Sequence, residues 1–368
     1  MRNDPDLKEE NIKMQASGAL RTRAISANTS DFTLRNPGSG MFCSRSSLQP
    51  TPTTNMHYHT HTTNDGCKLA FQSSVALADV SAEEVPQQCV LLMHGFSGSS
   101  EYFTRNFDAL RQSLWVIAPD MRGHGKSDHT RGGYHVARLA ADLKSLVTHL
   151  RRLSPKVQIV PAGCSIGAAV LWTYVELFGC DHFAGFVFVD QAPLQDRSMF
   201  DGWTKAFAHS GCFDEGSLLA AQRSWMQDTQ AAHADLVRSS LGYRHQPRED
   251  DQISDEQARE DEDFFLGISA RCDSAWLARL MADHTRYDHR EAIELITIPT
   301  LVMAGRRSGC FPLDGMLETV RRIERHRPGL AKSSIFESGH WLFYEEPERF
   351  NEEVAEFVKM CTEKSERP

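Results

Sequence analysis

The chain has 368 residues, of which 40% are hydrophobic and 24% charged, so it is neither fibrous nor wholly disordered. Its 40 Lys and Arg residues against 49 Asp and Glu residues give a formal net charge of −9. This acidic balance disfavours a surface that binds nucleic acid or an anionic membrane. We therefore expect a small-molecule substrate and no nucleic-acid partner.

Signals for location are few. The sequence has no apolar run of about eighteen residues, so we expect no integral membrane association. The first residues, MRNDPDLKEENIK, lack the apolar core of a secretory signal, and the nine cysteines are scattered without a C-x-x-C pair. These features predict a cytoplasmic protein with free thiols. Organellar targeting by the N-terminal tail stays open, and no motif indicates the oligomeric state.

The chain divides into three predicted parts. Residues 1–55 are rich in Ser, Thr, Asn and Pro without helical or strand period, which predicts a disordered tail. Residues 56–193 and 291–368 form the predicted core. Residues 194–290 lack a convincing strand and hold scattered aromatic residues and an acidic run, so we predict a helical insertion, a cap, within that core.

Strands and helices alternate along the core. The stretch 57–61 reads as a strand, Asp65-Gly66 as a two-residue hairpin turn and 67–75 as the next strand. Further predicted strands are 89–93, 114–118, 157–160, 186–189, 300–304 and 332–336. Predicted helices are 101–112, 134–153, 168–178, 313–325 and 346–362. This alternation indicates an α/β protein with a mostly parallel sheet and helices on both faces.

The strongest chemical signal is Gly163-Cys-Ser-Ile-Gly167, a G-x-S-x-G pattern between a predicted strand and a predicted helix. A sharp strand-to-helix turn leaves no room for side chains beside a nucleophile, which explains both glycines. Ser165 would stand at a helix N-terminus, where the dipole favours developing negative charge. The pattern predicts a nucleophilic serine, whereas a buried serine in an ordinary turn is the alternative.

Three further motifs accompany this G-x-S-x-G turn: His94-Gly-Phe96, Asp120-Met-Arg-Gly-His-Gly-Lys-Ser-Asp128 and Ser338-Gly-His-Trp341. Together they resemble the α/β-hydrolase family, in its capped branch with a serine nucleophile. The resemblance implies an eight-stranded, mostly parallel sheet, with a helical cap between its sixth and seventh core strands. It also implies that the backbone N–H groups of Phe96 and Ile166 form the oxyanion hole. His94 is expected to be structural.

His340 is the expected general base, because it follows the last predicted strand and a neutral imidazole can take the proton of Ser165. The triad acid has more than one candidate. The family usually has Gly-x-x-Asp after the strand at 301–304, and here Ser308 occupies that position. Asp190 is the favoured acid, since it lies at the end of the predicted strand 186–189 that follows the helix after Ser165. Asp314 is the alternative, and a dyad without an acid or an inactive site is the third possibility.

These residues predict a serine hydrolase that cleaves a carboxylic ester or related acyl compound through an acyl-enzyme, with no cofactor and no metal. The substrate is expected to carry an apolar group, since the insertion is rich in aromatic residues. A catalytically impaired ligand-binding or scaffold protein is the main alternative, followed by a cofactor-free perhydrolase or carbon–carbon hydrolase. His57, His59 and His61 would share one face of a strand, but a partly exposed edge strand is favoured over a metal site.

Overall fold

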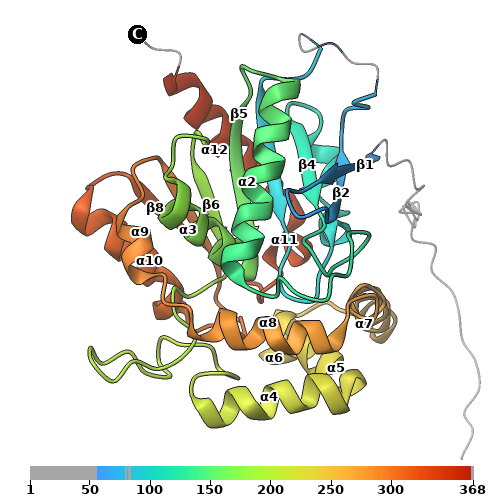
Figure 1. Ribbon diagram of the computed structural model, residues 1–368. Coiled ribbons are helices and arrows are strands. Elements are labelled where there is room, and N and C mark those ends of the chain that lie inside the picture. Colours follow the sequence, from blue (N-terminus) through green and yellow to red (C-terminus); the bar gives the residue numbers. More distant parts are fainter. Residues whose placement is uncertain (1–55, 79–80, 82–83, 366–368) are drawn as a thin grey trace, which may run out of the picture. The chain divides into compact units, whose positions relative to one another are not determined.

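The central feature of the computed structural model is an eight-stranded sheet (Figure 1). The structure describes residues 56–78, 81 and 84–365, and the predicted tail lies outside them. The strands are β1 (His57–Thr62), β2 (Lys68–Ser73), β3 (Gln88–Met93), β4 (Trp115–Pro119), β5 (Gln158–Cys164), β6 (Phe186–Val189), β7 (Thr300–Gly305) and β8 (Ala331–Phe336). Their order across the sheet is β1-β2-β4-β3-β5-β6-β7-β8. The mostly parallel sheet that the sequence predicts is therefore confirmed.

Only the first two pairings are antiparallel, β1 with β2 and β2 with β4, and the other five are parallel. One detail of the hairpin was wrong. Thr62 pairs with Lys68, and Thr63 N–H donates to Cys67 O at 2.9 Å, so the turn is longer than the predicted two residues. Gly66 takes φ +88°, the left-handed conformation that lets such a longer loop close.

Helices cover both faces of the sheet (Figure 1). Those outside the 194–290 segment are η1 (Ser100–Phe103), α1 (Phe107–Leu110), α2 (Val136–Leu153), α3 (Ile166–Phe178), α10 (Leu313–His326), α11 (Leu342–Glu345) and α12 (Pro347–Ser365). The single helix predicted at 101–112 is instead two short helices, η1 and α1. Tertiary contacts interrupt it, since Asn106 between them bonds Phe343 O and Asn351 at 3.0 Å.

Because side chains alternate along each strand, the sheet packs against two large apolar clusters, one on each face. In β3, Leu91 and Met93 pack in the cluster that contains α2 and α3. Val90 and Leu92 point to the other face, which packs with residues of α1 and α12. The central strands β3, β4, β6 and β7 are therefore buried on both sides, which explains their nearly continuous apolar sequence.

The chain between β6 and β7 forms α4 (Glu215–Gln227), α5 (Thr229–Ser240), α6 (Gly242–His245), α7 (Asp255–Ser269), α8 (Ser274–Arg286) and α9 (Arg290–Glu294). No strand occurs within this described stretch, and α4 to α8 lie together beyond one end of the sheet (Figure 1). Among the described residues, no helix is both long and apolar enough to cross a membrane.

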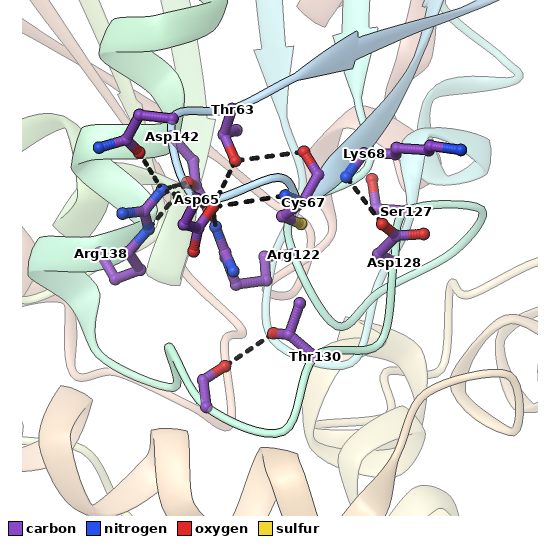
Figure 2. A network of polar contacts seen from close by, with 12 residues as sticks. Thr63, Asp65, Cys67, Lys68, Arg122, Ser127, Asp128, Thr130, Arg138 and Asp142 are labelled. Atoms are coloured by element: carbon purple, nitrogen blue, oxygen red, sulfur yellow. Dashed lines mark hydrogen bonds and ion pairs between the residues drawn. The ribbon is translucent and has the colours of Figure 1, made fainter.

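An ion-pair network around the buried Arg122 fixes the 120–128 loop to the β1–β2 turn and to α2 (Figure 2). The side chain of Arg122 is only 2% exposed, and its guanidinium donates to both carboxylate oxygens of Asp142, at 2.7 and 2.9 Å. It also donates to Asp65 at 2.9 Å, and Arg138 contacts both carboxylates. The network joins the β1–β2 turn, the loop and α2, so Arg122 has a structural role here.

Candidate functional site

Ser165 is the only residue between β5, which ends at Cys164, and α3, which begins at Ile166. Its backbone has φ 55° and ψ −124°, an unfavourable conformation for a residue with a side chain. The flanking glycines are required by space. A Cβ on Gly163 would lie 2.6 Å from the Gly167 carbonyl carbon, and one on Gly167 would lie 2.8 Å from Met93 O.

His340 lies between β8 and α11, and its ring is held by Asp190 at the end of β6. The distance from His340 Nδ1 to Asp190 Oδ1 is 2.5 Å, and the side chains are only 4% and 0% exposed. A carboxylate only accepts hydrogen bonds, so Nδ1 carries the imidazole proton and Nε2 is left as an acceptor. Among the described residues, no hydrogen bond joins Ser165 Oγ to His340.

The Asp190 carboxylate is fixed from two further directions. Gly305 N–H, at the end of the neighbouring strand β7, donates to Oδ2 at 2.7 Å. The Ser308 hydroxyl donates to Oδ1 at 2.8 Å, and its oxygen accepts the N–H groups of Cys310 and Phe311 at 3.3 Å. Ser308, at the position where the resembling family usually has an aspartate, therefore contacts the carboxylate that reaches the histidine.

The structure does not bring Asp314 to this place. It lies in the first turn of α10 with a side chain that is 76% exposed, and its nearest cation is Arg321 at 3.7 Å. Of the two carboxylates considered from the sequence, only Asp190 contacts His340.

Gly95, which precedes Phe96, lies close to the serine: a Cβ added to it would lie 3.2 Å from Ser165 Cβ. Met121 N–H donates to His94 Nε2 at 2.9 Å, so Nδ1 carries the proton and donates to Gly95 O at 2.8 Å. Gly98 N–H donates to the same oxygen at 3.1 Å. In a trans peptide the N–H points away from the C=O, which directs Phe96 N–H to the side opposite these donors. Ile166 N–H is the first of α3 and has no acceptor within the helix.

A cavity of about 300 Å³ joins these groups, since Gly95, Phe96, Ser165 and His340 all line it. The 194–290 segment supplies much of the remaining wall. The large apolar lining residues are Phe96, Trp225, Leu236, Met281, Phe311 and Trp341. The polar ones include Gln195, His209, Ser224, Asp235, Arg238, Ser239 and His284. The site therefore lies at the carboxyl end of the strands, where parallel sheets place their ligands.

Comparison with known proteins agrees with this architecture. Residues 88–347, more than half of the chain, match the family model for the alpha/beta hydrolase fold. The chain belongs to the α/β-hydrolase fold family. It is 24% identical over 270 residues to the AB hydrolase superfamily protein YisY of Bacillus subtilis, covering 73% of this chain and 90% of that protein.

Solved α/β-hydrolase structures are also similar. An esterase from Exiguobacterium antarcticum matches with a TM-score of 0.67 and 20% identity, over 82% of this chain and 98% of that chain. A bromoperoxidase from Bacillus anthracis matches with a TM-score of 0.67 and 19% identity, over 82% and 100%. At these identities the structural matches establish the fold and leave the substrate open.

Some residues that line the cavity of this α/β-hydrolase belong to none of the motifs recognised in the sequence. His209 lines the cavity, and its Nδ1 accepts Gly211 N–H at 2.9 Å. Burial, together with the nearby His340, lowers the pKa of His209 to about 4, so its ring is neutral near pH 7. Cys310 and Phe311, just after Ser308, are further lining residues. Only their position after β7 could have indicated them.

The histidines of β1 do not gather with other ligand types. His59 Nε2 contacts Val75 O at 3.3 Å and His61 Nε2 contacts Ser145 Oγ at 2.8 Å. No group of three or more His, Cys, Asp or Glu residues suited to a metal ion occurs in the part of the chain that the structure describes. β1 is one of the two edge strands of the sheet, and its side chains are partly or fully exposed.

Proposed function

We propose that this protein is a serine hydrolase that cleaves small carboxylic esters or related acyl compounds through an acyl-enzyme. One observation carries the proposal. Ser165 and His340 line the same cavity, and the Asp190 carboxylate lies 2.5 Å from Nδ1 of His340, which leaves Nε2 of that ring free to act as a base. This is the order of groups that activates a serine nucleophile.

In the proposed reaction His340 Nε2 takes the hydroxyl proton while Ser165 Oγ attacks the acyl carbon. The carbonyl π electrons move to oxygen, and the N–H groups of Phe96 and Ile166 stabilise that oxyanion. Collapse of the intermediate expels the alcohol, which receives the proton from His340. A water molecule then attacks the acyl-enzyme by the same route, releasing the acid and restoring Ser165. Asp190 keeps the neutral imidazole in the required tautomer and stabilises the imidazolium that forms when His340 takes the proton.

The cavity favours a small, partly apolar substrate. About 300 Å³ is at the lower end of the range for small-molecule sites. Aromatic and aliphatic side chains such as Trp225, Leu236 and Phe311 form much of the wall. In this proposal the 194–290 segment acts as a cap, and esters of short acids are hydrolysed faster than esters of long fatty acids.

The test is covalent labelling of the purified protein with a fluorophosphonate, which reacts with an activated serine with loss of fluoride. Wild type is compared with Ser165→Ala and His340→Ala, and p-nitrophenyl acetate, butyrate and palmitate report turnover. We expect labelling of Ser165 and loss of both readouts in each variant. A folded wild type that neither labels nor hydrolyses any ester would reject the proposal and favour a ligand-binding role.

A further inference from the structure

The backbone just before His340 is held by one carboxylate. Glu345, the last residue of α11, accepts Gly339 N–H with Oε2 at 2.7 Å and Gly242 N–H with Oε1 at 2.9 Å. Gly339 immediately precedes His340, whereas Gly242 is the first residue of α6 in the 194–290 segment. A single side chain thus bridges the loop of the candidate base and the segment that lines the cavity.

The two backbones meet without side chains between them. A Cβ on Gly339 would lie 2.3 Å from Ser240 O and 2.4 Å from Gly242 N. A Cβ on Gly305 would lie 2.0 Å from Gly339 O, and Gly305 N–H is the group that donates to Asp190. A shift of the Gly339 backbone would therefore disturb both the histidine and the end of β7 that fixes its carboxylate partner.

Charged groups around Glu345 come from several elements. Arg307, on the loop after β7, is the cation that favours its ionised form, although Arg307 itself pairs with Asp251 and donates to Gln246 O. The recess of about 590 Å³ beside Glu345 has further ionisable residues in its wall: Arg105, Tyr243, Asp250, Asp261, Glu337, Tyr344 and Glu346. Burial outweighs the favourable contacts and raises the pKa of Glu345 to about 7.

We propose that Glu345 is a positioning residue for the hydrolase reaction: its ionised carboxylate holds the loop of His340 against the 194–290 segment. This inference rests on the proposed function. The carboxylate offers each of the two N–H groups a charged acceptor oxygen. The protonated acid presents an O–H on one oxygen, which is then a much weaker acceptor, so the bond to either Gly242 or Gly339 is weakened. The base loop is therefore held firmly on both sides only when Glu345 is ionised.

The decisive experiment compares kcat and KM of wild type and Glu345→Gln for p-nitrophenyl butyrate between about pH 5.5 and 9. The amide of Gln offers one acceptor oxygen and so resembles the protonated acid at every pH. We expect the variant to lose about 10- to 100-fold in kcat above pH 8 with little change in KM, as for a small misplacement of a catalytic group. Below about pH 6 the two enzymes should approach the same rate. A ratio of wild-type kcat to Glu345→Gln kcat that is constant across pH would overturn the proposal.

Glu346→Gln is the matched control. Glu346 is adjacent and has a 30% exposed side chain that pairs with Arg349, without a bond to either glycine N–H. The ratio of the wild-type kcat to the Glu346→Gln kcat should stay near one at every pH. A loss equal to that of Glu345→Gln would show that any charge change at this site disturbs the enzyme, and would overturn the assignment.

A second readout does not depend on activity or on the folding of a variant. The amide proton resonances of Gly339 and Gly242 in the wild type, followed by NMR, should shift together with a midpoint near neutral pH. Amide signals that do not respond between pH 5.5 and 8.5 would overturn the inference. If the protein shows this response but neither labels nor hydrolyses esters, the proposed function fails while the pH-dependent contact stands.

Discussion

The Ser308 hydroxyl donates a hydrogen bond to the Asp190 carboxylate over 2.8 Å, although the two residues are 118 positions apart in the chain. The contact is possible because β6 and β7 are neighbours in the sheet, so the residues that follow them lie side by side. The serine that replaces the usual acid thus lies on the loop after the adjacent strand β7 and supports the carboxylate that contacts His340.

Replacement of that carboxylate should separate the two candidate acids. We expect Asp190→Asn to lower kcat for ester hydrolysis by about 10,000-fold, because the amide can stabilise the wrong imidazole tautomer and no positive charge. Asp314→Asn should leave kcat within about twofold, since Asp314 is 76% exposed on α10. Steady-state kinetics on a chromogenic ester measures both, and equal losses in the two variants would contradict the assignment.

Ser308→Ala removes one hydrogen bond to Asp190 and leaves the Gly305 N–H in place. A hydrogen bond to a charged group contributes about 1.5–3 kcal/mol, so we expect a loss of about 10- to 100-fold in kcat. KM should change little, because Ser308 is not among the residues that line the cavity. Kinetics together with the melting temperature will show whether the loss arises in a folded enzyme, and unchanged kcat would refute the supporting role.

Acid should destabilise the protein through buried neutral histidines. Burial lowers the pKa of His94 to about 4 and of His124 and His289 to about 3, and these side chains are 0%, 0% and 1% exposed. The unfolded chain binds these protons near pH 6.5, so their contribution to stability is present above that pH and is lost as pH falls toward 4. The loss for His94 alone is about 3 kcal/mol.

Urea unfolding at pH 7.5, 6 and 5 measures this effect. The free energy of unfolding should fall over the series, with proton uptake on unfolding near pH 5.5. Glu345 acts in the opposite direction, because its raised pKa favours the native state at lower pH, so it makes the fall smaller. A free energy of unfolding that is constant or rises from pH 7.5 to 5 would show that the histidines do not dominate.

The network of Figure 2 predicts a large loss of stability on Arg122→Met. The substitution leaves Asp142, whose side chain is 4% exposed, with only Arg138 as a cationic partner, and breaking a buried pair costs about 3–5 kcal/mol. Asp65→Asn is the control, because Asp65 is 41% exposed and exposed pairs contribute about 1 kcal/mol or less. Thermal and urea unfolding of both variants test the contrast. Equal losses would mean that Asp65 is the essential partner.

Much of the fold was readable from the sequence because its information is local. A short apolar run predicts a strand buried on both faces, and the observed β6 coincides with the predicted stretch 186–189. The turn at the nucleophile is local as well: the two glycines and Ser165 lie within five residues, and the close approach of Gly163 to Gly167 explains the first glycine. The sequence alone thus determined the alternation, the family resemblance and the choice of candidate nucleophile.

Tertiary structure decided which distant groups meet. Asp190 and Asp314 are both compatible with the order of residues along the chain, and only the adjacency of β6, β7 and the loop after β8 brings Asp190 to His340. The bridge made by Glu345 likewise joins residues 103 positions apart. Such contacts depend on strand order and on backbones that approach closely at glycine, and neither property leaves a periodic pattern in the sequence.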